Sequence, residues 1–204
     1  MSESERLTTI RRAFDARAAT YDESLMHREL AAFVADFIEL VDVHDVLDIA
    51  TGTGLVLRAL HRRQVDVRLT GVDLSSGMLD VARRHLPTAT WIEADAAALP
   101  VPDRSMDLIT CVTALHAIPD TRATLSEWRR VLRRGGRVVT ATFADERPRA
   151  PRVSRNAYPS DHEPFGSVER LAAVAGAAGF RIARTTRWAD ADDALLIAEW
   201  MPAA

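Results

Sequence analysis

The sequence feature that most constrains the fold is a regular alternation of short apolar runs and helical segments between residues 46 and 143. Short apolar runs are typical of buried parallel strands. Strands that alternate with helices are joined by right-handed crossovers, which place helices on both faces of a parallel sheet. The sequence therefore predicts an α/β fold with strands at residues 46–50, 67–72, 90–93, 106–112 and 137–143.

Helical spacing of apolar residues and helix-capping residues mark the segments around these strands. Ser24 is the expected N-cap of the first core helix. A helix before the fifth strand is expected to run to Arg134, where Gly135 and Gly136 close it as a left-handed cap. The other helices are expected at residues 25–41, 55–63, 75–86 and 168–178.

Two further strands are expected near the C-terminus, at residues 180–187 and 194–200. The acidic turn between them is too short for a parallel crossover, so these two strands should be antiparallel. The stretch at 144–166 lacks periodicity, contains four prolines and exceeds the usual length of a loop, which is typical of a lid.

Composition excludes several classes of function. The net charge is −3, so no overall basic field attracts nucleic acid. All 26 basic residues are arginine, so no lysine can form a Schiff base. The single cysteine, Cys111, rules out an internal disulfide and a cysteine-rich zinc site, and the histidines show no metal-ligand spacing. No apolar run approaches the length of a membrane span, and the first residues are polar, so we expect a cytoplasmic protein that binds no metal and no membrane.

A glycine loop follows the first expected strand, with Gly52 and Gly54 between that strand and a helix. Glycines at such a turn let the backbone approach a ligand closely. Asp73 ends the second strand, where a carboxylate can accept hydrogen bonds from both hydroxyls of a ribose, and Asp95 ends the third. Because parallel strand ends open on one crevice, these residues predict a site for a nucleoside.

Two kinds of cofactor compete for this site. A dinucleotide needs a third glycine three residues after Gly54, and that position is Leu57. Asp48 would also repel a phosphate. S-adenosylmethionine, which carries a sulfonium, an ammonium and no phosphate, suits the acidic residues better than a nicotinamide dinucleotide.

At this point the chain resembles class I S-adenosylmethionine-dependent methyltransferases, in the branch similar to the ubiquinone/menaquinone-biosynthesis methyltransferases. The resemblance covers roughly residues 10–200 in the right order. It is carried by Phe14-Asp15, Ala19-Thr20-Tyr21-Asp22, the loop at 46–54, Gly71-Val72-Asp73-Leu74-Ser75 with Met78 and Ala82, the segments 93–100 and 106–109, Leu115-His116, the segment 132–136 and Gly179-Phe180.

The resemblance implies a Rossmann-like, doubly wound sheet of seven strands, mostly parallel with an antiparallel C-terminal strand. It also implies that the whole chain is a single methyltransferase domain. Within it we expect a helical arm over the site (1–42), a cofactor-binding core (43–143), a lid loop (144–166) and a C-terminal helix with a strand pair (167–204).

The resemblance also assigns roles around the cofactor. Gly52 and Gly54 would approach its methionine part, in a loop where Ala50 replaces a glycine common in relatives, and Asp48 would lie near its amino group. Asp73 would bind the ribose hydroxyls, Leu74 and Met78 would flank the adenine, and Asp95 and Ala96 would contact its edge. The backbone of Thr113 would lie beside the cofactor, and Tyr21 would close over the site.

The residues that could contact the molecule receiving the methyl group are indicated only by their chemistry. His116 follows the fourth strand and could remove a proton from the acceptor. Arg147, Arg152 and Tyr158 lie in the expected lid, where arginine could bind an acidic or phenolate acceptor.

The predicted function is methyl transfer from S-adenosylmethionine to an oxygen, nitrogen or carbon atom of a small molecule, which leaves S-adenosylhomocysteine. The acceptor should not be nucleic acid, and the chain could be a monomer or a homodimer. One alternative is a cofactor-binding protein without catalysis that acts as a partner or sensor. A second alternative is a reductase that uses NAD(P).

Overall fold

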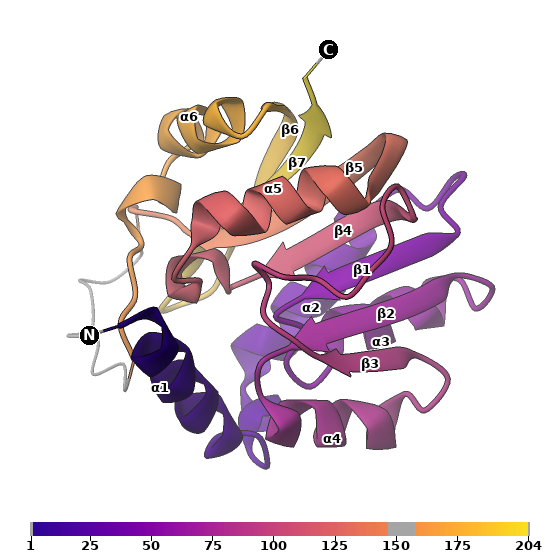
Figure 1. Ribbon diagram of the computed structural model, residues 1–204, viewed down its shortest axis with the longest axis vertical. Coiled ribbons are helices and arrows are strands. Elements are labelled where there is room, and N and C mark those ends of the chain that lie inside the picture. Colours follow the sequence, from indigo (N-terminus) through magenta and orange to yellow (C-terminus); the bar gives the residue numbers. More distant parts are fainter. Residues whose placement is uncertain (1, 147–157, 204) are drawn as a thin grey trace.

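The computed structural model describes residues 2–146 and 158–203. Its centre is one seven-stranded sheet with the strand order β3-β2-β1-β4-β5-β7-β6 (Figure 1). The strands are β1 (Asp45–Ile49), β2 (Arg68–Asp73), β3 (Thr90–Glu93), β4 (Met106–Val112), β5 (Leu132–Phe143), β6 (Phe180–Ala189) and β7 (Ala194–Pro202).

Strands β3, β2, β1, β4 and β5 run parallel to one another. β7 is antiparallel to both of its neighbours, β5 and β6. The predicted α/β fold and the antiparallel C-terminal pair are therefore confirmed. The order along the sheet reverses between β1 and β4, and such a reversal opens a crevice at the carboxyl ends of the strands.

Helices cover both faces of the sheet, with α5 and α6 in front and α2 and α3 behind it in Figure 1. Within the described residues, no helix combines the length and the apolar character that crossing a membrane would require. The helices are α1 (Glu3–Asp15), η1 (Tyr21–Glu23), α2 (Leu25–Phe37), α3 (Leu55–Arg63), α4 (Ser76–His85), η2 (Leu115–Ala117), α5 (Thr121–Val131), η3 (Glu163–Phe165) and α6 (Val168–Ala177), where η marks a short 3-10 helix.

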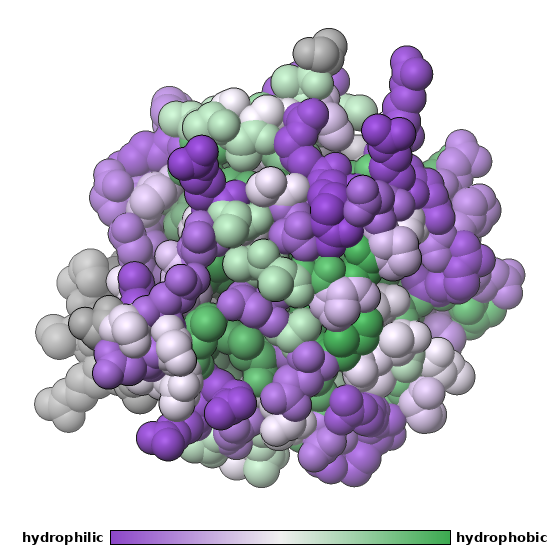
Figure 2. Space-filling model, in the orientation of Figure 1, coloured by the Kyte–Doolittle hydropathy of each residue, from purple (hydrophilic) through white to green (hydrophobic). Residues whose placement is uncertain are grey.

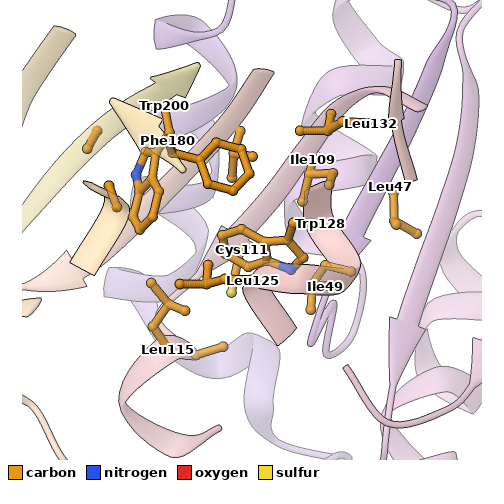
Figure 3. Packing of buried hydrophobic residues seen from close by; sticks show 14 of the residues in the cluster. Leu47, Ile49, Ile109, Cys111, Leu115, Leu125, Trp128, Leu132, Phe180 and Trp200 are labelled. Atoms are coloured by element: carbon orange, nitrogen blue, oxygen red, sulfur yellow. The ribbon is translucent and has the colours of Figure 1, made fainter. Parts of the chain in front are cut away.

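The two faces of the sheet carry separate hydrophobic cores. The core under α5 and α6 is built around Trp128, whose ring meets that of Trp200 edge to face at 5.9 Å (Figure 3). The Trp200 indole also donates to the Thr140 hydroxyl at 2.9 Å, so its polar atom is satisfied inside the core. Cys111 is fully buried in the same cluster, where it acts as a small apolar residue.

Two predicted helix ends are wrong. α2 ends at Phe37 instead of residue 41, because Ile38 is extended and the Arg63 guanidinium binds the carbonyl groups of Ala35 and Ile38. α5 ends at Val131 instead of Arg134, so Gly135 and Gly136 do not cap it.

The cause at the second end is a long-range contact. Leu132 is extended and pairs with Met106 of β4, which starts β5 five residues earlier than predicted. Arg133 then reaches the carboxylates of Asp45 and Asp107, at 2.7 Å each. Local helix signals could not reveal these partners.

Candidate functional site

A cavity lies at the carboxyl ends of the parallel strands, whose arrowheads point toward α1 in Figure 1. It holds about 700 Å³ of empty space, part of it open to solvent. Figure 2 shows apolar residues at the surface between α1 and the strand ends, bordered by polar side chains. We call it the strand-end cavity, and its lining is Ile10, Phe14, Tyr21, Ala50, Gly52, Val72, Asp73, Leu74, Ala94, Asp95, Ala96, Val112, Thr113, Ala114, Ala117, Ile118 and Pro119.

A second, smaller cavity adjoins the first on the other side of the glycine loop. It shares with the strand-end cavity the residues Tyr21, Ala50, Gly52, Val112 and Thr113. We call it the loop cavity, and its remaining lining is His27, Leu30, Ala31, Asp48, Thr51, Thr53, Leu55 and Val56.

The loop that separates the cavities is strongly curved. Ala50, Gly52 and Gly54 all have positive φ angles, of 52°, 56° and 78°. A side chain at such an angle is strained, which gives Ala50 a physical cost that a glycine would not have. At Gly54 an added Cβ would lie 2.5 Å from the Trp91 ring, so packing as well as φ requires glycine there.

Asp73 joins the loop to the next helix. Its carboxylate accepts from the backbone N–H of Gly52 at 2.7 Å and from that of Ser75 at 2.8 Å. Burial raises the pKa of this carboxyl to about 6. Ser75, and not Asp73, is the N-cap of α4, since its side chain accepts from the Met78 N–H. Asp73 therefore lines the cavity without serving as a helix cap.

Asp48 is buried beneath the loop, with 2% of its surface exposed. Its two oxygens accept from the hydroxyls of Thr51 and Thr110, both at 2.6 Å. Burial raises its pKa to about 6 as well. It lies in the wall of the loop cavity and not in that of the strand-end cavity.

Most of the other predicted cofactor residues meet at the strand-end cavity. Leu74, Asp95 and Ala96 line it, and the Asp95 carboxylate also accepts from the Ala97 N–H at 3.0 Å. Two predicted residues, Gly54 and Met78, line neither of the two cavities. Met78 is fully buried, in a small cluster with residues of the N-terminal segment.

Tyr21 lies in the wall of both cavities. Its side chain shares a hydrogen bond with that of Thr113, and burial raises the pKa of its phenol to about 12, so the hydroxyl stays neutral. Thr113 itself has a φ of 54°, an angle that strains a β-branched residue. Strain of this kind gathers at functional sites.

A helical arm over the site is predicted from the sequence, but no lining residue is predicted in α1, which adds Ile10 and Phe14 to the lining. Asp15 fixes this helix to the start of α4, because its carboxylate accepts from the Ser75 hydroxyl at 2.6 Å and the Gly77 N–H at 3.1 Å. The spacing of Leu7, Ile10 and Phe14 was the available signal, since it places three apolar residues on one helix face.

The acceptor-side predictions fall around η2 and α1. His116 lies in η2 between the lining residues Ala114 and Ala117, and its ring stacks on that of His162 at 4.1 Å. The Tyr158 ring lies 5.2 Å from that of Phe14. Arg147 and Arg152 lie outside the described residues.

The chemistry of the strand-end cavity is acidic and apolar. Asp73 and Asp95 supply its charged side chains, and none of the described lining residues is basic. A phosphate would find no positive partner among them. Ribose hydroxyls would find carboxylate oxygens that accept hydrogen bonds, and a flat heterocycle would find apolar side chains. Among the residues the structure describes, no three His, Cys, Asp or Glu side chains are grouped to hold a metal ion.

Comparison with known proteins points the same way. A family model described as a methyltransferase domain matches residues 46–136. Demethylmenaquinone methyltransferase of Thermus thermophilus is 32% identical over 167 residues, which cover 67% of this chain and 74% of the relative. The enzyme of the same name from Thermotoga maritima is 41% identical over 136 residues, covering 63% of this chain and 58% of the relative.

Among solved structures, the complex of DhpI with SAH has a TM-score of 0.76 at 23% identity and covers 99% of both chains. This likeness shows a shared fold. The chain spans about half the length of several curated relatives that it matches, including malonyl-[acyl-carrier protein] O-methyltransferases of Halorhodospira halophila and Hahella chejuensis.

Proposed function

The chain belongs to the family of class I S-adenosylmethionine-dependent methyltransferases, and on that premise we propose that it transfers the methyl group of S-adenosylmethionine to a small-molecule acceptor. The accepting atom is oxygen, nitrogen or carbon. Relatives named for demethylmenaquinone and for malonyl-[acyl-carrier protein] support methylation as the reaction class.

The observation that carries the proposal is that the carboxylates of Asp73 and Asp95 both line a largely apolar cavity at the strand ends. Acidic side chains accept from the hydroxyls and amino group of an adenosine and attract a sulfonium. They repel the pyrophosphate of a dinucleotide. These hydrogen-bond acceptors therefore fit S-adenosylmethionine and argue against NAD(P).

On the adenosine side, Asp73 would accept from the ribose hydroxyls in addition to its two backbone partners. Asp95 and the Ala96 backbone would bind the adenine edge. Leu74 would cover one face of the adenine. Met78, which is buried behind the cavity wall, would pack behind that face.

On the methionine side, the backbone of Gly52 and Thr113 would lie against the cofactor, and Gly54 would keep the loop in its curved form. Asp48 would attract the ammonium group through the loop cavity. Tyr21 would cover the site, its neutral hydroxyl held by Thr113.

When bound, S-adenosylmethionine supplies an activated methyl group on a sulfonium, whose leaving sulfur is neutral. The chain's part is to orient an acceptor and to exclude water, and positioning of this kind can supply about 7–11 kcal/mol. No general base is obligatory. Where the acceptor must lose a proton, we propose His116 as the base, with Tyr158, Arg147 and Arg152 on the acceptor side.

The class of acceptor, the location in the cell and the oligomeric state are also proposals. An acceptor of small size, and not a nucleic acid or a membrane surface, is favoured by the net charge of −3 and by a cavity that is only partly open to solvent. We propose that the chain works in the cytoplasm, either alone or as a homodimer.

The test is a transfer assay with S-adenosylmethionine labelled in its methyl group and a panel of phenols, carboxylates, amines and carbon acids. We expect label in at least one acceptor class, together with S-adenosylhomocysteine in equal amount. Binding of S-adenosylhomocysteine without transfer to any class would favour the non-catalytic alternative. Saturable binding of NADPH in its place would favour the reductase.

A further inference from the structure

The loop cavity contains a polar atom that the proposed function has not used. Under that function, this cavity would receive the amino-acid end of the cofactor, which carries an ammonium and a carboxylate. The two groups need opposite partners, so the polar atoms around the cavity must divide between them.

Asp48 suits only the ammonium, because a carboxylate repels another carboxylate. Three N–H groups of the glycine loop are already engaged. That of Gly52 donates to Asp73 at 2.7 Å, that of Gly54 to the Thr51 carbonyl at 2.9 Å, and that of Thr51 to the Val72 carbonyl at 3.0 Å. These three N–H groups cannot bind the cofactor's carboxylate without losing a partner, so a donor from outside the loop would strengthen its binding.

His27 offers such a donor. It is the third residue of α2, lines the loop cavity, and stacks on Tyr21 with ring centroids 4.3 Å apart and planes 10° apart. Its Nδ1 atom is buried and has no hydrogen-bond partner. A buried polar atom without a partner costs free energy, which a ligand would recover. The ring also has a hydrogen bond with the Tyr21 backbone, and burial lowers its pKa. Since either imidazole nitrogen can carry the proton, and both carry one in the imidazolium that a bound carboxylate favours, Nδ1 can donate to such a ligand.

Positive charge near His27 offsets the carboxylates around it. Of these, Asp48 is already assigned to the ammonium, and Asp22 is paired with Arg58 at 2.6 Å. Leu55 and Val56, in the first turn of α3, line the same cavity, and this helix has no side-chain N-cap. The positive end of the helix dipole is therefore left for a ligand. The Arg17 guanidinium lies 5.5 Å above the Tyr21 ring, on which His27 is stacked, and adds to the positive potential.

We propose that His27 is a positioning residue that donates a hydrogen bond from Nδ1 to the α-carboxylate of the cofactor. It would fix the amino-acid end in the loop cavity and so set where the sulfonium lies between the two cavities. This inference rests on the proposed function, since it needs a cofactor with an amino-acid end.

The test compares three ligands by calorimetric titration: S-adenosylhomocysteine, its decarboxylated analogue, and 5′-methylthioadenosine, which lacks the amino-acid end. His27→Phe keeps an aromatic ring on Tyr21 and removes Nδ1. We expect it to weaken binding of S-adenosylhomocysteine at least about tenfold, the size of a lost hydrogen bond to a charged group, and to leave the other two ligands unchanged. His27→Asn, whose amide nitrogen can replace Nδ1, should recover part of the affinity.

Other outcomes overturn the inference. Equal weakening of all three ligands by His27→Phe would mean that His27 acts only through Tyr21 and the fold. Unchanged binding of S-adenosylhomocysteine by His27→Phe, or by His27→Ala if the phenylalanine variant does not fold, would mean that Nδ1 makes no contact. If the wild-type protein binds none of the three ligands, the proposed function itself fails and this inference fails with it.

Discussion

Each acidic residue of the site already has a partner in the protein, and the partners differ in kind. Asp73 holds two backbone N–H groups, whereas Asp48 holds two threonine hydroxyls. A carboxylate with two oxygens has further lone pairs, so these bonds leave room for a ligand. The internal bonds fix each carboxylate in place before any ligand arrives, which reduces the entropy lost on binding.

Replacing Asp73 with alanine should weaken binding of S-adenosylhomocysteine. The loss should be about 1.5–3 kcal/mol for each hydrogen bond to the charged carboxylate. Calorimetric titration measures it, with Asp66→Ala, an exposed acid in the turn before β2, as the control that should bind normally. Unchanged affinity in Asp73→Ala would remove Asp73 from the site.

Cofactor affinity should fall as the pH is lowered through about 6. Burial raises the pKa of both Asp73 and Asp48 to about 6, so each takes up a proton below that pH and loses the charge that favours the ligand. Well below its pKa, each group should reduce the affinity about tenfold per pH unit. Titrations between pH 5 and 8 test this, and a flat profile would contradict it. Asp73→Asn should remove the part of the slope due to Asp73.

Ala50→Gly should stabilise the protein. Alanine at a φ of 52° is strained, and glycine is not. We expect the free energy of unfolding to rise by about 1 kcal/mol. The matched control is Ala172→Gly, at an exposed position within α6, which should lower it by about 0.5–1 kcal/mol. Denaturant unfolding measures both, and a loss of stability in Ala50→Gly would show that the alanine methyl makes a compensating contact.

The location of the acids and glycines at strand ends could be predicted from the sequence, because these residues directly follow apolar runs. The contacts that each side chain makes could not be predicted. The contact between Gly54 and Trp91 and the stacking of His27 on Tyr21 join residues that only the fold brings together.

Among the elements, α1 is a wall of the site that belongs neither to the sheet nor to the loops after its strands. It lines the strand-end cavity through Ile10 and Phe14 and is tied to α4 by Asp15. Apart from Tyr21 of η1, the rest of the lining comes from strand ends and the segments that follow them. Since α1 contacts α4 more than any other element, we expect it to be a wall that can detach without disturbing the sheet.

Asp15→Ala should loosen α1 and leave the sheet unchanged. Loss of the bonds to Ser75 and Gly77 removes its polar anchor, so amide hydrogen exchange should become faster within residues 3–15 and stay unchanged in β1 and β4. Asp80→Ala, which removes an exposed ion pair with Arg83, is the control and should leave α1 as it is. Equal exchange in α1 of Asp15→Ala and wild type would show that apolar contacts alone hold the helix.

Most element boundaries were predictable because local signals set them. The expected helix at 55–63 and the expected strands at 90–93 and 106–112 match α3, β3 and β4. The ends of α2 and α5 were not predictable. Arg63 terminates the first from another helix, and pairing with β4 draws residues 132–136 into a strand.

At the scale of the whole molecule, the alternation of strands and helices was sufficient to predict the parallel sheet and its two covered faces. The strand order places the reversal between β1 and β4, and the glycine loop after β1 lies there. Asp73 and Asp95 follow the neighbouring strands β2 and β3. The acids therefore meet at one cavity because of topology, although they are distant in the sequence.

The most direct test of this account is a calorimetric titration of the wild-type protein with S-adenosylhomocysteine and with NAD in the same buffer at pH 7.5. The account predicts saturable binding of S-adenosylhomocysteine at one site per chain and no binding of NAD. Binding of NAD, or no binding of S-adenosylhomocysteine, would contradict it.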